Sequence, residues 1–373
     1  MKIILFANTS WFLYNFHLQL ARTLRDQGHE VILLSPTDEY GVRLESEGFR
    51  HLDIPLSRRG INPLSELASL IRIYQIYRLE RPDLVHHFTI KCVLYGTLAA
   101  RLAGVKRIVN WITGLGYIFI GKGILPRTLK TLAFFAYRAL LSESAVIFEN
   151  QDDQIFFETA KLVKPGHHFL IIGTGVDTDQ FNAVPESPGA PIVIMPSRLL
   201  WDKGVGEFIE ASRMIKRAGI ESRFALVGKI DPGNPSAVPE ADLQAWVKEG
   251  LVEWWGWKED MPSVYAQSHI VCLPSYREGV PKALLEAAAA GRPIVASDVP
   301  GCREVVREGV NGFLVPPRDP VALAKALERL LRDITLRGKM GANGRDIAVE
   351  QFSVQFIVEQ ILAVYRHVET MTG

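Results

Sequence analysis

The stretch that decides the fold is residues 270–296, IVCLPSYREGVPKALLEAAAAGRPIVA. An apolar run, Ile270–Leu273, opens it and a second run, Pro293–Ala296, closes it, and both have the length and composition of buried strands. The residues between them predict a helix, because Pro281 suits a first helical turn, Ala, Leu and Glu propagate a helix, and Gly291 ends it. Strand, helix and strand in this order are typical of a parallel βαβ unit.

The same alternation of short β-branched runs and helical patterns extends over the whole chain. Amphipathic stretches such as Phe16–Gln27 and Pro63–Leu79 separate the runs. Alternating strands and helices imply parallel sheets covered by helices on both faces, so we predict an α/β protein. The other expected strands are Lys2–Ala7, Glu30–Ser35, Asp83–His87, Arg107–Trp111, Ala145–Phe148, Pro191–Met195 and Ser222–Val227.

A stretch rich in Pro, Gly, Ala and Ser, Asn182–Pro191 (NAVPESPGAP), divides the chain nearly in half. We therefore predict an N-terminal domain over residues 1–182 and a C-terminal domain over residues 183–353. The final helical pattern, within residues 354–373, is expected to pack back on the first domain. Doubly wound domains bind ligands at the carboxyl ends of their strands, so the functional residues should directly follow strands.

The composition is that of a globular protein, with 48% apolar and 22% charged residues among 373. Its 42 Lys and Arg against 41 Asp and Glu give a net charge of +1, which argues against a general nucleic-acid binder. The three cysteines (Cys92, Cys272 and Cys302) form no C-x-x-C pair, so neither a disulfide framework nor a Cys-based zinc site is expected. No signal peptide or long apolar span is recognisable, and we expect a cytoplasmic protein.

The charge is nevertheless unevenly distributed. Between Leu84 and Ser142 the chain has eight basic residues and no Asp or Glu. Such a block indicates an anionic partner for this half of the chain. The eight residues are Lys91, Arg101, Lys106, Arg107, Lys122, Arg127, Lys130 and Arg138.

Two segments that follow predicted strands have the residues for an anion site. The first amides of the helix after Ile270–Leu273 attract a phosphate, with Glu278 before the helix and Glu286 eight residues on, a rise of about 12 Å if helical. That spacing suits two groups that hold opposite ends of an elongated ligand. In Ser197–Val205 (SRLLWDKGV), Arg198 and Lys203 flank a loop and are suited to neutralise a diphosphate. The alternative for both segments is that their charged side chains are solvated and bind no ligand.

Taken together, these segments resemble the motifs of one known protein family. Arg198…Lys203-Gly204 followed by Glu278-x7-Glu286 resembles the donor site of family 4 retaining glycosyltransferases with the GT-B fold. IGTGVDTDQF at 172–181 and NGFLVP at 311–316 are similar to further stretches of that family, so the resemblance covers nearly the whole chain. It implies two doubly wound Rossmann-like domains that face a central cleft.

The resemblance also implies roles for individual residues. Arg198 and Lys203 would hold the donor diphosphate and stabilise the leaving nucleotide, with Glu278 beside the donor sugar, and these three are the expected catalytic residues. Glu286 would accept the ribose hydroxyls. The remaining donor-binding residues would be Gly204, Gly256, Lys258, Gly279 and Val280, with the loop 256–258 facing the base. A UDP-sugar would be the donor substrate, with no cofactor and no metal ion.

In the N-terminal half, SRRGINP at 57–63, HHFTIKCVLYG at 86–96 and NWITGLGYIF at 110–119 resemble bacterial enzymes that extend polyprenyl-diphosphate-linked sugars. Those enzymes typically use UDP-N-acetylhexosamines, and the basic block fits a diphosphate acceptor. The acceptor-binding residues implied are Arg58, Arg59, His86, Lys91, Thr113 and Gly114.

The chain departs from the family pattern at two places. Asn8-Thr9-Ser10-Trp11 replaces a glycine-rich turn after the first strand, and Thr113-Gly114-Leu115-Gly116 stands about where many relatives have a histidine. The general base therefore stays unidentified. His86 and His87 line the cleft in one interpretation and are packed histidines in the other.

The segment Ile124–Ser142 has two interpretations. Helical spacing places Arg127, Lys130 and Arg138 on one stripe with Phe134, and leucines on the other face. A basic stripe that holds an aromatic residue suits a membrane surface, here the inner face of the cell membrane, where the enzyme would be peripheral. An ordinary core-facing helix with a solvated basic side is the alternative.

The sequence thus predicts a retaining, metal-independent transferase that moves an N-acetylhexosamine from a UDP-sugar to a polyprenyl-diphosphate-linked saccharide in surface polysaccharide or glycan assembly. A nucleotide-sugar isomerase resembling UDP-N-acetylglucosamine 2-epimerase is the main alternative, and a lectin-like or scaffold protein is another. Asp177-Thr178-Asp179 has the D-x-D form of metal-dependent glycosyltransferases, but its position in a loop near the linker makes it incidental. No dinucleotide, H-E-x-x-H or G-x-S-x-G motif competes.

Overall fold

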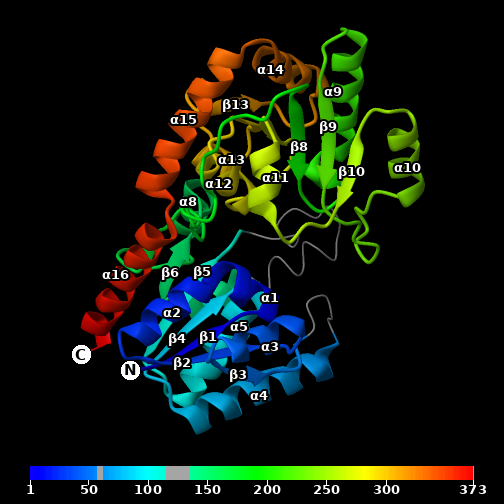
Figure 1. Cartoon of the computed structure of the whole chain (residues 1–373). Coiled ribbons are helices and arrows are strands. Elements are labelled where there is room, and N and C mark those ends of the chain that lie inside the picture. The colour runs from blue at the N-terminus through cyan, green and yellow to red at the C-terminus, as the bar shows by residue number, and fades with distance from the viewer. Residues whose placement is uncertain (57–61, 115–133, 373) are drawn as a thin grey trace. The chain divides into compact units, whose positions relative to one another are not determined.

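The computed structural model describes residues 1–56, 62–114 and 134–372 (Figure 1). The chain divides into two compact units, Met1–Thr174 with Ile357–Gly373, and Gly175–Phe356. Both units are parallel sheets with helices on their faces, so the predicted α/β class and the two Rossmann-like domains are confirmed.

Unit 1 has a seven-stranded sheet in the order β3-β2-β1-β4-β5-β6-β7, and every pairing in it is parallel. The strand order reverses between β1 and β4, which is where doubly wound sheets bind ligands. The strands are β1 Lys2–Phe6, β2 Glu30–Ser35, β3 Arg50–Asp53, β4 Leu84–Phe88, β5 Arg107–Ile112, β6 Ala145–Phe148 and β7 His168–Leu170. The labelled helices are α1 Ser10–Phe12, α2 Leu18–Asp26, α3 Glu39–Ser46, α4 Pro63–Glu80, α5 Ile90–Ala103, α8 Gln151–Thr159 and α16 Val354–Thr372, with a π-helical turn at Leu13–His17.

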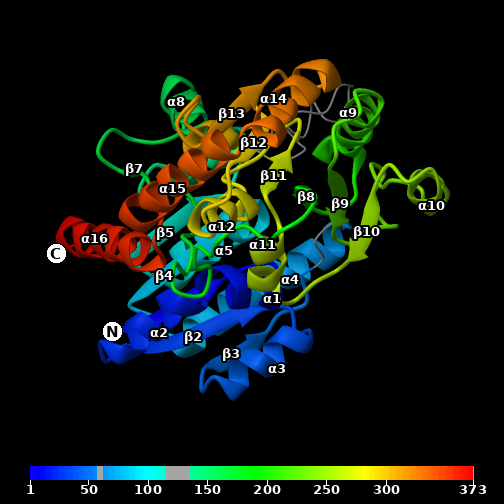
Figure 2. The same cartoon turned by 45° about the horizontal axis from the view of Figure 1, so that its top comes forward.

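Unit 2 has a six-stranded parallel sheet in the order β10-β9-β8-β11-β12-β13 (Figure 2). The strands are β8 Ile192–Pro196, β9 Arg223–Val227, β10 Glu253–Gly256, β11 Ile270–Leu273, β12 Ile294–Ser297 and β13 Gly312–Val315. The helices are α9 Val205–Arg217, α10 Glu240–Lys248, α11 Met261–Gln267, α12 Lys282–Ala289, α13 Pro300–Val305, α14 Pro320–Arg332 and α15 Ile334–Gln351, with a 3-10 turn at Trp201–Lys203.

The proline-rich stretch 182–191 packs on unit 2, and the contact boundary lies before it, at Thr174. Glu186 in this stretch forms an ion pair with Arg337 at 2.7 Å, and the Val184 carbonyl accepts a hydrogen bond from Arg292. Both arginines are buried, so each needs these oxygen partners to compensate its lost hydration. A stretch with linker composition is therefore fixed in place by two buried cations.

Helix α16 is anchored to the sheet of unit 1 at its centre. Tyr365 of α16 places its Oη 2.8 Å from Nδ1 of His86, in the middle of β4. Apolar side chains of α16, including Ile361 and Leu362, are buried beside this contact. The end of the chain thus completes the core of the unit that contains its beginning.

Among the described residues, no helix is both long enough and apolar enough to span a bilayer.

Candidate functional site

The residues predicted to bind a donor lie at the carboxyl edge of the unit 2 sheet. Arg198 follows β8, and Lys203 and Gly204 precede α9. Glu278 lies in the loop between β11 and α12. Because carboxyl ends of parallel strands share one edge, these loops are neighbours although some 80 residues separate them in sequence.

Lys203 and Glu278 join two of these loops. The lysine Nζ lies 2.6 Å from Oε1 of Glu278, and both side chains are largely shielded from water. A lysine ammonium has three N–H donors, and Glu278 is its one side-chain partner in the described part of the chain. The pair therefore holds the cation in place and leaves donors for an anionic ligand.

Arg198 forms a looser pair. Its Nη1 lies 3.2 Å from Oδ2 of Asp231, in the loop after β9, and the arginine side chain is 48% exposed. Exposed ion pairs contribute little to stability, so the guanidinium can exchange the carboxylate for a phosphate at low cost. The two cations predicted from sequence are thus both present at one edge, each with a protein carboxylate.

Tyr276 was missed by the sequence interpretation, although it fixes the same two loops. Its backbone N–H donates to the carbonyl of Asp202, and its Oη donates to Glu207 of α9 at 2.8 Å. Burial, together with the Glu207 hydrogen bond, raises the pKa of Tyr276 to about 12, so the phenol stays neutral and remains a donor. The sequence around Tyr276 has no local pattern that predicts this role.

Two glycines allow the loops to approach at backbone distance. Gly204 has φ +81°, and a Cβ there would lie 2.1 Å from the Pro274 carbonyl oxygen. A Cβ on Gly301, in α13, would lie 0.9 Å from the carbonyl oxygen of Gly279. Gly204 was predicted and Gly301 was not, although the Pro300-Gly301 pair directly after a strand is a signal that could have found it.

Glu286 lies inside the unit, on α12. Its Oε2 is 3.0 Å from the Oη of Tyr265 on α11, and Lys282 Nζ is 3.9 Å from Oε1. Burial raises the pKa of Glu286, outweighing the lysine and the tyrosine hydrogen bond, which both favour the ionised form. The carboxyl is therefore a strong hydrogen-bond partner in a poorly hydrated place.

The predicted base-binding loop 256–258 is joined to the loop after β9. The carbonyl of Gly256 accepts a hydrogen bond from the N–H of Gly228 at 2.9 Å. Trp257 is half exposed, and the Lys229 ammonium lies 5.3 Å from its ring centre. Lys258 is exposed. The indole offers an aromatic surface that sequence reasoning did not single out.

In unit 1, the predicted acceptor residues fall into three groups. Thr113 and Gly114 directly follow β5, and Lys91 lies in the first turn of α5, 2.8 Å from Glu66 of α4. His86 is fully buried and bonded to Tyr365. Arg58 and Arg59 lie outside the described residues.

The two consecutive histidines of β4 point to opposite faces of the sheet, as alternate strand residues do. His87 has Nδ1 at 2.9 Å from Asn110 Oδ1, and its Nε2 at 3.0 Å from Tyr77 Oη, and burial lowers its pKa to about 4. Burial also lowers the pKa of His86. Of the two interpretations offered by the sequence, the packed one describes both side chains.

Two further sequence predictions concern other loops. Of the basic stripe in 124–142, Arg127 and Lys130 lie outside the described residues, while Arg138 is exposed on a helix over 134–141. Asp177 of the D-x-D string accepts hydrogen bonds from the backbone N–H of Asp179 and Gln180. The Asp177 carboxylate thus closes a local turn.

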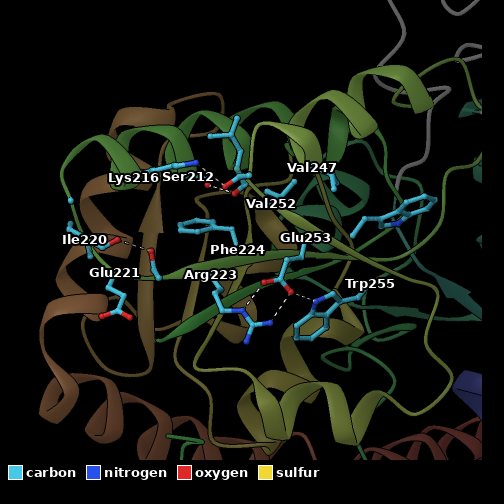
Figure 3. A pocket seen from close by; sticks show the side chains of 15 residues that line it. Ser212, Lys216, Ile220, Glu221, Arg223, Phe224, Val247, Val252, Glu253 and Trp255 are labelled. Atoms are coloured by element: carbon cyan, nitrogen blue, oxygen red, sulfur yellow. Dashed lines mark hydrogen bonds and ion pairs between the residues drawn. The ribbon is translucent and has the colours of Figure 1, made fainter. Parts of the chain in front are cut away.

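A groove of about 780 Å³ lies at the other edge of unit 2 (Figure 3). It is lined by the starts of β9 and β10 and by the loops before them. Arg223 there forms an ion pair with Glu253 at 2.7 Å, and Trp255 donates its Nε1–H to the same carboxylate. The groove contains no residue predicted for the site, so it supplies a matched surface for control variants.

Comparison with known proteins identifies the chain. Residues 190–333 match the family described as "Glycosyl transferases group 1", and residues 2–150 match "Glycosyl transferase 4-like". This chain belongs to the glycosyltransferases. The first match spans every predicted donor-site residue, from Arg198 to Glu286, and the second spans the strands β1 to β6 of unit 1.

Two relatives of this glycosyltransferase are bacterial enzymes. It is 28% identical, over 99% of both chains, to the N,N'-diacetylbacillosaminyl-diphospho-undecaprenol alpha-1,3-N-acetylgalactosaminyltransferase of Campylobacter jejuni. It is 27% identical, over 86% of this chain and 84% of the other, to the UDP-Gal:alpha-D-GlcNAc-diphosphoundecaprenol alpha-1,3-galactosyltransferase of Escherichia coli. Both are transferases, and nothing in either favours the isomerase alternative.

A solved structure shows the same fold. HepE of Anabaena, in complex with UDP and glucose, superposes with a TM-score of 0.81 at 22% identity, covering 97% of this chain and 98% of the other. The predicted GT-B class is thereby confirmed for this glycosyltransferase.

Proposed function

We propose that this glycosyltransferase moves an N-acetylhexosamine from a UDP-sugar to a polyprenyl-diphosphate-linked saccharide, with retention at the anomeric carbon and without a metal ion. The observation that carries the proposal is the pair of cations, Arg198 and Lys203, held by carboxylates at one edge of unit 2. The acceptor class is supported by the two bacterial relatives, which by their names act on undecaprenyl-diphosphate-linked sugars. Such an acceptor would bring the enzyme to the inner face of the cell membrane, as a peripheral protein.

The reaction needs stabilisation of a leaving diphosphate. The bond between the anomeric carbon and the β-phosphate oxygen breaks, and its electron pair leaves with UDP. The acceptor hydroxyl oxygen bonds to the anomeric carbon from the same face, and its proton passes to the departing phosphate oxygen. Fixed cations at the diphosphate stabilise the charge that develops there, which is the role we assign to Arg198 and Lys203.

Glu278 has a defined task in this scheme. Its carboxylate already holds the Lys203 ammonium at 2.6 Å, so the lysine needs little reorganisation when the donor binds. The neighbouring amides of Gly279 and Val280 would contact the phosphates or the sugar. The loop that contains them packs against Gly301, which fixes its path.

Glu286 would bind the ribose hydroxyls, and Trp257 of the loop 256–258 would lie near the base. Tyr265 holds one Glu286 oxygen and leaves the other for a ligand hydroxyl, with Lys282 nearby. For the acceptor we retain Lys91, Thr113 and Gly114, together with Arg58 and Arg59. We omit His86, because its side chain has no exposed surface and serves Tyr365.

A turnover assay followed by mass spectrometry tests this function. Purified protein receives UDP-GalNAc, UDP-GlcNAc or UDP-hexoses, each with and without a polyprenyl-diphosphate-linked sugar, and each with and without a chelator. We expect the lipid to gain one sugar residue only when the acceptor is present, at a rate that the chelator leaves unchanged. NMR of the product should show the anomeric configuration of the donor. An altered nucleotide sugar without acceptor would contradict the proposal and establish the isomerase.

A further inference from the structure

The first strand of unit 1 is followed by an uncommon helical turn. After β1 the chain forms the short helix α1 and then a π-helical turn, Leu13–His17, before α2 begins. In such a turn the backbone hydrogen bonds join residues five apart, and single π-helical turns occur frequently at functional sites. The stretch Asn8–Trp11, where the sequence departs from a glycine-rich turn, leads directly into it. This segment is therefore a candidate ligand-binding feature of unit 1.

The wide turn brings aromatic rings together. Five residues of α-helix would place two side chains about 140° apart around the helix axis, too far for contact. Here the ring centres of Trp11 and Phe16 are 5.3 Å apart in an edge-to-face arrangement, and those of Phe12 and Phe16 are 4.9 Å apart. The side-chain amide of Asn15 donates to the Trp11 carbonyl at 2.9 Å and holds the turn. We call Trp11, Phe12 and Phe16 the aromatic cluster.

The aromatic cluster is fixed to the sheet where the strand order reverses. His17, at the end of the turn, is 2% exposed and stacks on Phe88, the last residue of β4, with ring centres 3.8 Å apart. At the start of α1, the Ser10 hydroxyl donates to the Pro36 carbonyl, after β2, at 2.6 Å. Because β1 and β4 flank the reversal, the cluster lies at the carboxyl edge where doubly wound sheets bind ligands.

The three rings of the cluster are only partly buried. Leu13 and His17 of the same turn are 1% and 2% exposed, so the turn is firmly packed on its inner side. Trp11, Phe12 and Phe16 each keep part of their surface in solvent. Aromatic rings that are held by packing and still reach solvent offer a ligand a preorganised surface at a low cost in conformational entropy.

The surroundings of the cluster favour a neutral ligand. Residues 3–21 contain no Asp, Glu, Lys or Arg, and the polar side chains beside the rings include Asn8, Thr9 and Asn15. A diphosphate requires cations, and the cation that we assign to it, Lys91, is on α5. A pyranose has a face of C–H groups that packs on the negative face of an aromatic ring, and hydroxyls around its rim for amide and hydroxyl side chains. The chemistry therefore fits the sugar part of the acceptor.

From these observations we infer that the aromatic cluster binds the saccharide of the lipid-linked acceptor, with one sugar ring stacked on Trp11. The inference rests on the proposed function and deepens it, because it separates the acceptor site into a cationic part for the diphosphate and an aromatic part for the sugar. Trp11 thereby becomes a residue that determines acceptor specificity. The departure at Asn8–Trp11 acquires a purpose, since a glycine-rich turn has no ring to offer.

Calorimetric titration of the full chain tests the saccharide site. The probes are short-chain, water-soluble prenyl diphosphates that bear N-acetylglucosamine, N,N'-diacetylbacillosamine or a methyl group. The two sugars are those that the names of the two bacterial relatives place on their acceptors, and the methyl probe keeps the prenyl chain and the diphosphate charge. The test variants are Trp11→Ala and the conservative Trp11→Phe. The control is Trp246→Ala, since Trp246 is also partly buried and makes an edge-to-face contact, with Trp201.

We expect wild type and control to bind one of the sugar probes about tenfold more tightly than the methyl probe, a preference of the size that one aromatic contact supplies. Trp11→Ala should lose this preference while its affinity for the methyl probe stays unchanged, and Trp11→Phe should retain part of it. A wild type without preference, or a Trp11→Ala variant that keeps it, would overturn the inference. An equal loss of affinity for all three probes would also overturn it, because the ring would then serve the prenyl chain or the fold.

Steady-state turnover separates this inference from the proposed function. In Trp11→Ala the KM for the lipid-linked acceptor should rise about tenfold, while the KM for the UDP-sugar stays at the wild-type value. A rise in the KM for the UDP-sugar alone would assign the ring to the donor and overturn the inference. If wild type prefers a sugar probe through Trp11 but transfers no sugar to any acceptor, the proposed function fails and the saccharide site stands. If transfer proceeds and Trp11→Ala leaves both the probe preference and the acceptor KM unchanged, the saccharide site alone fails.

Discussion

The polar contacts described for the two units are of different kinds. In unit 2, ion pairs join loops that follow different strands, Arg198 with Asp231 and Lys203 with Glu278, and the arginine remains half exposed. In unit 1, side chains of the sheet and of α4 form neutral, buried networks, such as that of His87 in β4 with Asn110 in β5 and Tyr77 in α4. Charged pairs near the surface can exchange a protein partner for a ligand, whereas a neutral buried network fixes a shape.

The two units are therefore sensitive to substitution in different ways. Unit 2 should lose function readily when a charge is removed, with modest effects on its folding. Unit 1 should respond through its stability when a member of such a network is replaced, because His87 and Asn110 are fully buried.

Replacing Lys203 with Ala should have the largest effect. The change removes a fixed cation from the leaving diphosphate, and the loss of one such stabilising group lowers kcat by about 10²- to 10³-fold. Steady-state kinetics with the UDP-sugar and acceptor would measure it. Lys216→Ala is the matched control, since that lysine bonds only to the carbonyls of Glu249 and Gly250 among described residues.

Because Lys203→Ala also leaves Glu278 without its partner, thermal unfolding must be measured on the same sample. Lys203→Ala combined with Glu278→Gln removes the uncompensated charge. If the double variant recovers a near-normal rate, Lys203 serves loop structure and not the diphosphate.

Arg198→Ala should lower kcat by about 10²-fold, somewhat less than Lys203→Ala because the more exposed guanidinium stabilises charge in a wetter place. Arg223→Ala offers a close control. The two arginines are 48% and 49% exposed, and each pairs with one carboxylate, Asp231 or Glu253. Arg198 lies at the carboxyl edge and Arg223 at the amino edge of the same sheet, and Arg223 contacts both oxygens of its carboxylate. Equal rates for the two variants would remove Arg198 from the mechanism.

Many strands and candidate site residues of unit 2 could be predicted from the sequence, because each of them has a signal within a short stretch of residues. Arg198, Lys203 and Glu278 each stand a few residues after a continuous apolar run, so strand, loop and charge are read together. Tyr265 was missed because it meets Glu286 from a different helix, 21 residues earlier in the chain. A contact of that kind leaves no spacing pattern in the sequence.

The strands that were missed have a common property. β3, β7 and β10 are all at sheet edges, with one neighbouring strand each. Their sequences, RHLD, HFL and EWWG, lack the apolar run of a strand buried on both faces. For His86 and His87, adjacency in sequence concealed opposite environments. Strand alternation separates the two rings, and only the tertiary structure shows that both are buried.

The stability of unit 1 should fall as the pH is lowered below neutral. Burial lowers the pKa of His87 to about 4 from an ordinary value of 6.5, so the unfolded chain takes up a proton that the folded unit refuses. The stability is complete above pH 6.5 and is lost as the pH falls towards 4, by about 3 kcal/mol for this residue. Hydrogen exchange of unit 1 amides at pH 5 and pH 7 would measure the loss.

His87→Gln is the variant that isolates this effect, since an amide keeps hydrogen-bonding capacity but does not titrate. The variant should be less stable than wild type at pH 7, because Asn110 and Tyr77 lose their imidazole partner, and its stability should depend less on pH. An unchanged pH slope would place the acid sensitivity at another group.

The smallest effect is expected at Glu286, and its sign is opposite. Burial raises the pKa of this carboxyl, so the folded unit binds a proton more readily than the unfolded chain does. Its contribution to stability therefore falls as the pH rises through the interval between the unfolded and the folded pKa. Glu286→Gln removes the buried charge but keeps a partner for Tyr265, so it should raise the melting temperature of unit 2 at pH 7 and above. The gain should shrink towards pH 4, where the carboxyl is protonated in both states.

The same variant should weaken binding of UDP in calorimetry, since a neutral amide is a poorer acceptor for ribose hydroxyls than a carboxylate is. A more stable unit that binds its ligand less well would identify Glu286 as a residue kept for recognition at a cost in stability. Unchanged UDP affinity would leave its burial without a functional reason.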